Sequence, residues 1–183
     1  MRPLQSVGMG LVIILIRAPV GDGYDALPDP IGWVLVLVGL SALPAGWPRR
    51  RELLGAAWLA AAISVGLWFP AVPDALADTH SSLTWAANLP QLGFATLLSL
   101  TLGRRAAEAG EAPAALWLRL AAAGFVAAAI LPVLDLGGGV SGADVASVVT
   151  AALTLIFLVA LLFRYSGRPW APSTAPRTRD SPR

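Results

Sequence analysis

Polar and apolar residues alternate along the chain in long blocks. Apolar runs of roughly twenty residues are separated by short segments in which Gly, Pro, Asp, Ser or Arg cluster. A helix needs about 20 apolar residues, at about 1.5 Å each, to cross the hydrocarbon core of a bilayer. The pattern therefore predicts an all-α fold, a polytopic transmembrane helical bundle with about six spans, at residues 4–20, 31–46, 52–69, 83–102, 113–134 and 143–165.

Arginines mark the ends of these runs. The segment Trp47-Pro48-Arg49-Arg50-Arg51-Glu52 separates the second run from the third, and three adjacent arginines beside an aromatic residue are typical of a cytoplasmic turn. If six helices alternate across the membrane from this point, every arginine except Arg17 falls on the same side. We therefore expect both termini to lie in the cytoplasm.

The two ends of the chain need separate interpretation. Residues 4–20 reach only about 25 Å, so this segment either crosses a thin region of bilayer or lies on the outer surface and leaves five spans. Its apolar core is short and Arg17 ends it without a cleavage site, so we expect it to remain in the mature protein. Residues 166–183 are rich in Pro, Ser, Thr and Arg, which predicts a disordered cytoplasmic tail.

Composition supports a membrane location. The chain is 56% hydrophobic and 13% charged, with a mean hydropathy of +0.69, and a soluble domain of this size could not cover so much apolar surface. We expect a multi-pass protein of a bacterial inner (plasma) membrane whose main partner is the lipid bilayer, without a nucleic-acid partner. The absence of Cys excludes disulfides, thiolate nucleophiles and cysteine-based metal sites.

Polar residues recur on one face of two predicted helices. In residues 83–102 the face contains Asn88, Gln91 and Ser99, and in residues 143–165 it contains Ser147, Thr150 and Thr154. Such faces either line a hydrated path or bond across helices as packing contacts, and we favour packing.

Charged residues avoid the predicted middle of the membrane. Arg17 lies near three acidic residues of the first outer loop, Asp22, Asp25 and Asp29, which makes an outer ion pair the candidate interaction there. A secondary transporter would need an embedded Asp, Glu or Lys as its coupling group, and the sequence offers none at mid-depth.

Enzyme signatures are missing. The single histidine, His80, cannot supply a paired zinc site, and no nucleophile motif or phosphate-binding glycine loop is present. We therefore expect no catalytic residue, no cofactor and no metal site, and we favour a protein that is not an enzyme.

The stretch Ala26-Leu27-Pro28-Asp29-Pro30-Ile31-Gly32-Trp33, followed by Gly39-Leu40, resembles a loop-to-helix pattern in uncharacterised small multi-span membrane proteins of high-GC bacteria. The resemblance covers about fifteen residues and implies no activity. It implies that Asp29, Gly32 and Gly39 fix the first hairpin, the two glycines lying seven apart on one helix face for close backbone approach.

Two functions remain open. The first is a non-enzymatic protein that acts through helix–helix association, as an accessory subunit of other membrane proteins or with copies of itself. Small residues at Ala121, Ala122, Gly124 and Ala128 favour it, because they let a neighbouring helix approach closely. The alternative is a small permease or channel whose polar path is lined by the fourth and sixth predicted helices.

Overall fold

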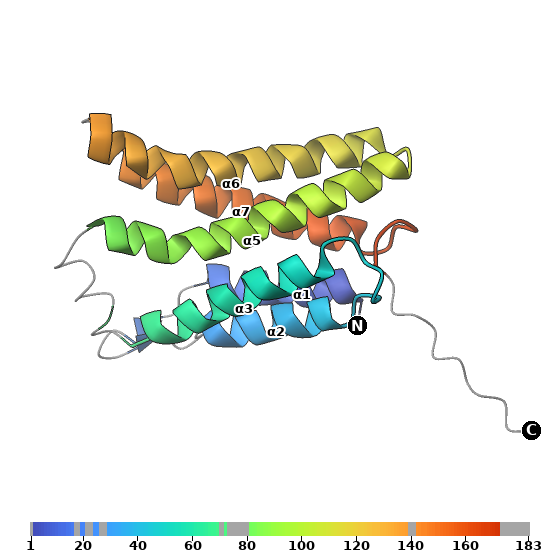
Figure 1. Ribbon diagram of the computed structural model, residues 1–183, viewed down its shortest axis with the longest axis horizontal. Helices are drawn as coiled ribbons and strands as arrows, with labels where there is room; N and C mark the ends of the chain where they lie inside the picture. The colour runs from blue at the N-terminus through green and yellow to red at the C-terminus, as the bar shows by residue number, and fades with distance from the viewer. Residues whose placement is uncertain are drawn as a thin grey trace, which may run out of the picture.

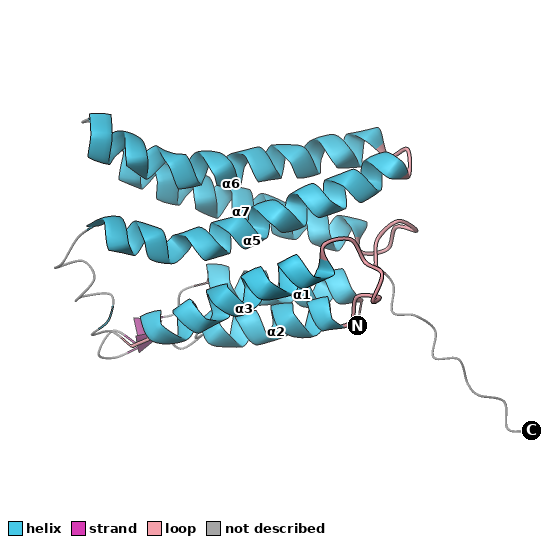
Figure 2. Ribbon diagram, viewed as in Figure 1, coloured by secondary structure: helices cyan, strands magenta, loops and turns pink. Residues whose placement is uncertain are grey.

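The computed structural model describes residues 2–16, 19–20, 24–25, 29–69, 72, 81–138 and 142–172. Its helices are α1 (Pro3–Leu15), α2 (Asp29–Ser41), α3 (Arg50–Leu67), α5 (Ser81–Glu108), α6 (Ala112–Gly138) and α7 (Ala143–Tyr165). Two two-residue strands, β1 (Pro19–Val20) and β2 (Tyr24–Asp25), pair antiparallel between α1 and α2. Apart from this pair, the described residues confirm the all-helical expectation (Figure 2).

The helices form two layers, with α1, α2 and α3 in one and α5, α6 and α7 in the other (Figure 1). Consecutive helices are antiparallel and pack against each other, while α1 packs on α7 and α3 packs on α5. The two layers therefore meet along their outer helices. This arrangement brings the starts of α1, α3 and α6 and the ends of α2, α5 and α7 to one end of the bundle.

Large side chains fill the space between the layers. Trp33 of α2 and Phe94 of α5 are fully buried and meet edge to face, with ring centroids 5.3 Å apart. Phe125 of α6 and Leu158 of α7 are buried in the same core. Such aromatic pairs add about 1 kcal/mol to the burial of their area, so the Trp33–Phe94 contact helps hold one layer against the other.

Glycines let α1 and α2 pack with their backbones almost in contact. A Cβ atom on Gly32 would lie 2.6 Å from the carbonyl oxygen of Gly10, and one on Gly39 would lie 2.7 Å from that of Pro3. No side chain fits at such distances, because real Cβ contacts essentially never fall below 3.0 Å. The prediction that Gly32 and Gly39 serve close backbone approach is confirmed, and Ser6 adds a hydrogen bond from its hydroxyl to the carbonyl of Leu35 at 2.8 Å.

Helix ends differ from the predicted bounds at several places. The predicted helix over 4–20 ends at Leu15, because Ile16 is extended and the chain enters β1 at Pro19. The predicted helix over 31–46 begins at Asp29 and ends at Ser41, ahead of a turn that contains Pro44, Gly46 and Pro48.

Three further helices exceed or shift from their predicted bounds, and one agrees with them. The segments predicted at 52–69, 83–102 and 113–134 are Arg50–Leu67, Ser81–Glu108 and Ala112–Gly138, whereas Ala143–Tyr165 matches its prediction. Helix α5 continues past Leu102 because Gly103 packs against α6 and Arg105 pairs with Glu108 one turn later.

The predicted disordered tail is partly ordered, which corrects the expectation for residues 166–172. Trp170 is only 6% exposed and packs on Tyr165, with ring centroids 5.6 Å apart. Arg168 donates to the carboxylate of Glu111 at 3.3 Å. The polar composition of the tail hides one large aromatic residue that the bundle end can bury, and residues 173–183 lie outside the described residues.

Candidate functional site

The outer faces of α6 and α7 are apolar and exposed. On α7, Val148 is 69% exposed and Leu153 is 62% exposed, and on α6 the exposed residues include Leu120 and Ile130. Within these helices, Ala112–Leu134 and Val145–Tyr165 are long and apolar enough to cross a membrane. Only 39% and 28% of their apolar windows are buried, whereas the core helix of a soluble protein is mostly buried. Two helices therefore present membrane-length apolar surface to the surroundings.

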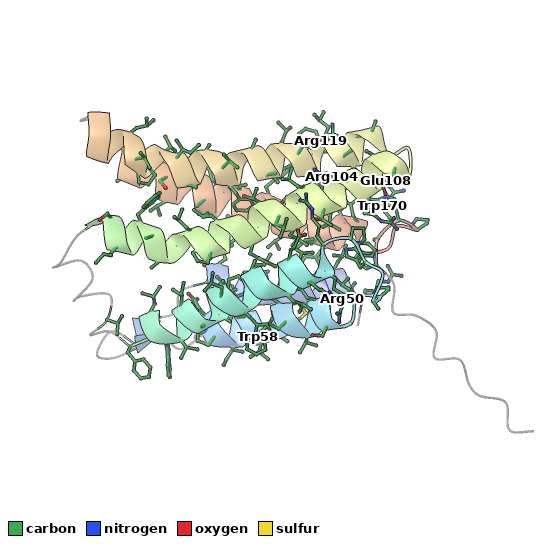
Figure 3. The ribbon with its side chains drawn as sticks, viewed as in Figure 1. Arg50, Trp58, Arg104, Glu108, Arg119 and Trp170 are labelled. Atoms are coloured by element: carbon green, nitrogen blue, oxygen red, sulfur yellow. The ribbon has the colours of Figure 1, made fainter. Side chains whose placement is uncertain are left out.

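Arginines gather at one end of the bundle. Arg50, Arg104 and Arg119 lie toward the same end in Figure 3, together with Trp170. Arg105 lies over the ring of Trp47, 5.1 Å from its centroid, which joins the end of α5 to the turn between α2 and α3. The arrangement expected from the arginine pattern, with positive charge concentrated at one end, is present among the described residues.

Arg50 has a local structural role. Its Nη2 donates to the carbonyl of Ser41 at 3.1 Å and its Nε donates to the carbonyl of Leu43 at 3.2 Å. These carbonyls lie at the end of α2, where a helix leaves acceptors without internal partners. One arginine of the triplet therefore caps α2, and the α2–α3 turn depends on it.

The polar residues predicted on α7 contact α6. Ser147 donates its hydroxyl to the carbonyl of Ala128 at 2.7 Å. That carbonyl lacks its usual helical donor, because Pro132, four residues later, has no N–H. Thr154 lies against Gly124, where an added Cβ would meet the threonine hydroxyl at 2.6 Å. Ser147 and Thr154 therefore make packing contacts, and Thr150 lies half-buried between them.

The polar residues predicted on α5 do not share one environment. Ser99 is buried and donates to the carbonyl of Ala95 at 2.7 Å, within its own helix. Gln91 is half-buried and Asn88 is exposed. The structure thus places these three residues along α5, and it places Ser147 and Thr154 against α6. The described contacts do not join the two stripes into a single polar surface.

The predicted outer ion pair falls largely outside the described residues. Arg17 and Asp22 are not described, Asp25 is described only as part of β2, and Asp29 begins α2. Within the part of the chain that the structure describes, no three His, Asp or Glu side chains group together as a metal site would require.

A groove between α5 and α6 was not predicted from the sequence. Its volume is about 590 Å³, and a second hollow of about 390 Å³ adjoins it along the same crease, sharing Thr96, Leu100, Val126 and Ile130. Alanines of α6 at 122, 123 and 127 leave the space that larger side chains would fill. The lining is apolar except for Thr96, whose hydroxyl bonds to the carbonyl of Leu92, and Arg119. The alanine spacing of three and four residues was the available signal.

The fold and these surfaces define a helical bundle with an apolar exterior and a basic end. Comparison of the chain with models of protein families, with curated proteins and with solved structures finds no match. The functional argument therefore depends on the chain's own surfaces.

One prediction concerns the Ser147 hydroxyl. Replacing Ser147 by alanine leaves the Ala128 carbonyl buried without a donor, and we expect the free energy of unfolding to fall by about 1–2 kcal/mol. In the double variant S147A/P132A the restored backbone N–H of residue 132 can bond to that carbonyl, so the loss due to S147A should shrink. Thermal unfolding in detergent micelles measures both. Equal losses with and without Pro132 would show that the hydrogen bond does not matter.

Proposed function

We propose that the chain is an integral protein of a bacterial inner membrane, with its six helices embedded and both termini in the cytoplasm. The carrying observation is the exposed apolar surface of α6 and α7, which is as long as a bilayer is thick. In water this surface would exceed the apolar patches that monomeric soluble proteins usually expose. In lipid it carries no such penalty, and the arginine-rich end takes the cytoplasmic side.

The α1–α2 hairpin fits this proposal with one condition. Each helix has 13 residues and reaches about 20 Å, less than the hydrocarbon core of about 30 Å. A hairpin of this reach requires either a thinner bilayer around it or a crossing that the connection between the two helices completes. Its close packing through Gly10 and Gly32 keeps the two helices together as one unit.

We propose further that the protein is not an enzyme and acts through helix–helix association, as an accessory subunit. The polar groups that a permease would need at mid-depth are engaged in packing, since Ser147 bonds to α6 and Ser99 bonds within α5. Small residues at Gly10, Gly32 and Gly124 are also used inside the bundle. The outward faces carry aliphatic side chains, which suit contact with lipid or with the apolar helices of a partner.

Topology is the direct test of the membrane proposal. The chain has no native Cys, so single cysteines report their own accessibility. We expect D25C to react with a membrane-impermeant thiol reagent added outside intact cells, and R51C to react only after the cells are permeabilised. Labelling of R51C from outside, or recovery of the protein as a monomer in detergent-free buffer, would overturn the proposal.

The same labelling tests the proposed role against a permease. T150C lies on the polar stripe of α7, close to mid-depth. A cysteine held in helix packing stays unreactive toward a water-soluble reagent, whereas one that lines a hydrated path reacts. We expect T150C to be silent in folded protein and reactive after denaturation. Reaction in the folded protein would replace the association role by a permease or channel.

A further inference from the structure

The groove between α5 and α6 has a shape and charge that suit one kind of molecule. On α6 its wall runs from Arg119 to Leu134, which is about 22 Å along the helix. One leaflet of a bilayer contributes about half of a 30 Å hydrocarbon core. The groove is therefore long enough to hold a lipid acyl chain along its apolar wall.

Charge is confined to one end of the groove. Arg119 lines it near the start of α6, and Arg104 continues the line of Thr96 and Leu100 on α5 at helical spacing. Both arginines are exposed, and neither takes part in the ion pairs of the described residues, which are Arg49–Glu52, Arg105–Glu108 and Arg168–Glu111. Two guanidinium groups are thus available for an anion at the cytoplasmic end.

Gly103 positions the longer of these side chains. A Cβ on Gly103 would lie 3.7 Å from Cγ of Arg119, so the arginine stem crosses α5 over the glycine. Long basic side chains commonly lay their methylene groups on apolar surface and extend the charge toward the interface. Figure 3 shows Arg104 and Arg119 on neighbouring helices toward the same end of the bundle.

We propose that this groove binds an anionic phospholipid of the cytoplasmic leaflet, with one acyl chain against Ala123, Val126 and Ala127 and the headgroup phosphate at Arg119 and Arg104. The inference rests on the proposed membrane location. Basic positions between membrane helices on the cytoplasmic side are a known basis for recognising anionic headgroups. Phosphate accepts hydrogen bonds from guanidinium in a bidentate manner, which favours Arg over Lys there.

The test uses a single cysteine in the groove and one outside it. A123C lies in the groove, and I156C lies on the exposed face of α7 at a similar distance from the inner end of its helix. Each is labelled with a small fluorophore and placed in phosphatidylcholine vesicles that contain brominated phosphatidylglycerol or brominated phosphatidylcholine. We expect brominated phosphatidylglycerol to quench A123C more strongly than brominated phosphatidylcholine does, and both lipids to quench I156C equally.

Variants assign the preference to the groove. R119Q should lower the preference for phosphatidylglycerol at A123C about five-fold, the amount expected for one arginine near a membrane surface. R51Q removes an exposed arginine of α3 at the same end of the bundle and should leave the preference unchanged. A127F fills the groove and should reduce quenching of A123C by both lipids. If R119Q does not fold, A127F together with R104Q decides, and unchanged quenching in both would overturn the proposal.

The remaining outcomes separate this inference from the membrane proposal. Equal quenching of A123C and I156C by both lipids would mean that only bulk lipid surrounds the protein, which overturns the lipid site and leaves the membrane location intact. No quenching at either position, with protein that does not float with the vesicles, would overturn the membrane location itself.

Discussion

Replacing Gly32 by alanine will separate α1 from α2 and lower the free energy of unfolding by about 3 kcal/mol or more. The new methyl group would lie 2.6 Å from the carbonyl oxygen of Gly10 and 2.6 Å from Cγ1 of Ile14. A flexible side chain can move away, but a backbone carbonyl in a neighbouring helix moves only with that helix. The substitution therefore forces the two helices apart along their contact, and thermal unfolding in detergent micelles measures the loss.

Gly55 of α3 provides the matched control. Nothing lies within 4 Å of a Cβ added there, so G55A should gain the usual advantage of alanine over glycine in a helix, about 0.5–1 kcal/mol. The same chemical change thus has opposite signs at the two positions. A G32A variant that unfolds at the same temperature as G55A would mean that α1 and α2 are not in backbone contact.

The sequence predicted one side of this contact but not the other. Gly32 and Gly39 were identified because they lie seven residues apart on one face. Their partners, Gly10 and Pro3, carry no such pattern, since helix pairing is decided by the three-dimensional match of two surfaces. Periodicity describes the face of a single helix, and it does not say which face of a neighbour will cover it.

Helix ends were predictable where the local chemistry was strong. Helix α7 begins after Gly142, which has a φ of 90°, and its predicted bounds match the structure. Helix α1 was predicted too long, because apolar residues continue past Leu15 although the backbone turns there. Apolar composition marks residues that avoid water, whereas the backbone direction at Ile16 follows from contacts made far along the chain.

The candidate surfaces divide in the same way. The predicted polar stripes exist on α5 and α7, yet the role of Ser147 depends on Pro132, which lies on another helix. The α5–α6 groove depends on alanines of one helix facing Thr96 and Leu100 of the next. The segment ending at Trp170 was predicted disordered from its composition, because a single aromatic residue weighs little in an average and much in a contact.

The largest qualitative test of the exterior is a charge placed on α7. Leu153 is 62% exposed and lies near the middle of Ala143–Tyr165. In a bilayer an arginine at this depth costs about 2.5–3.5 kcal/mol on insertion scales, so L153R should reduce the fraction of protein recovered in the membrane several-fold. In a water-soluble bundle the same substitution would replace an exposed leucine by a charged residue and would change stability by less than about 0.5 kcal/mol.

A second arginine variant separates depth from charge. Ala107 is exposed near the end of α5, beside Arg104 and Arg105, where the proposed topology places the cytoplasmic interface. A107R adds the same side chain there, and its guanidinium can remain in the headgroup region. We expect membrane recovery of A107R to equal that of the parent chain while L153R is depleted. Equal recovery of both variants would show that α7 does not face lipid at Leu153, and the outward face of the bundle would then need another covering.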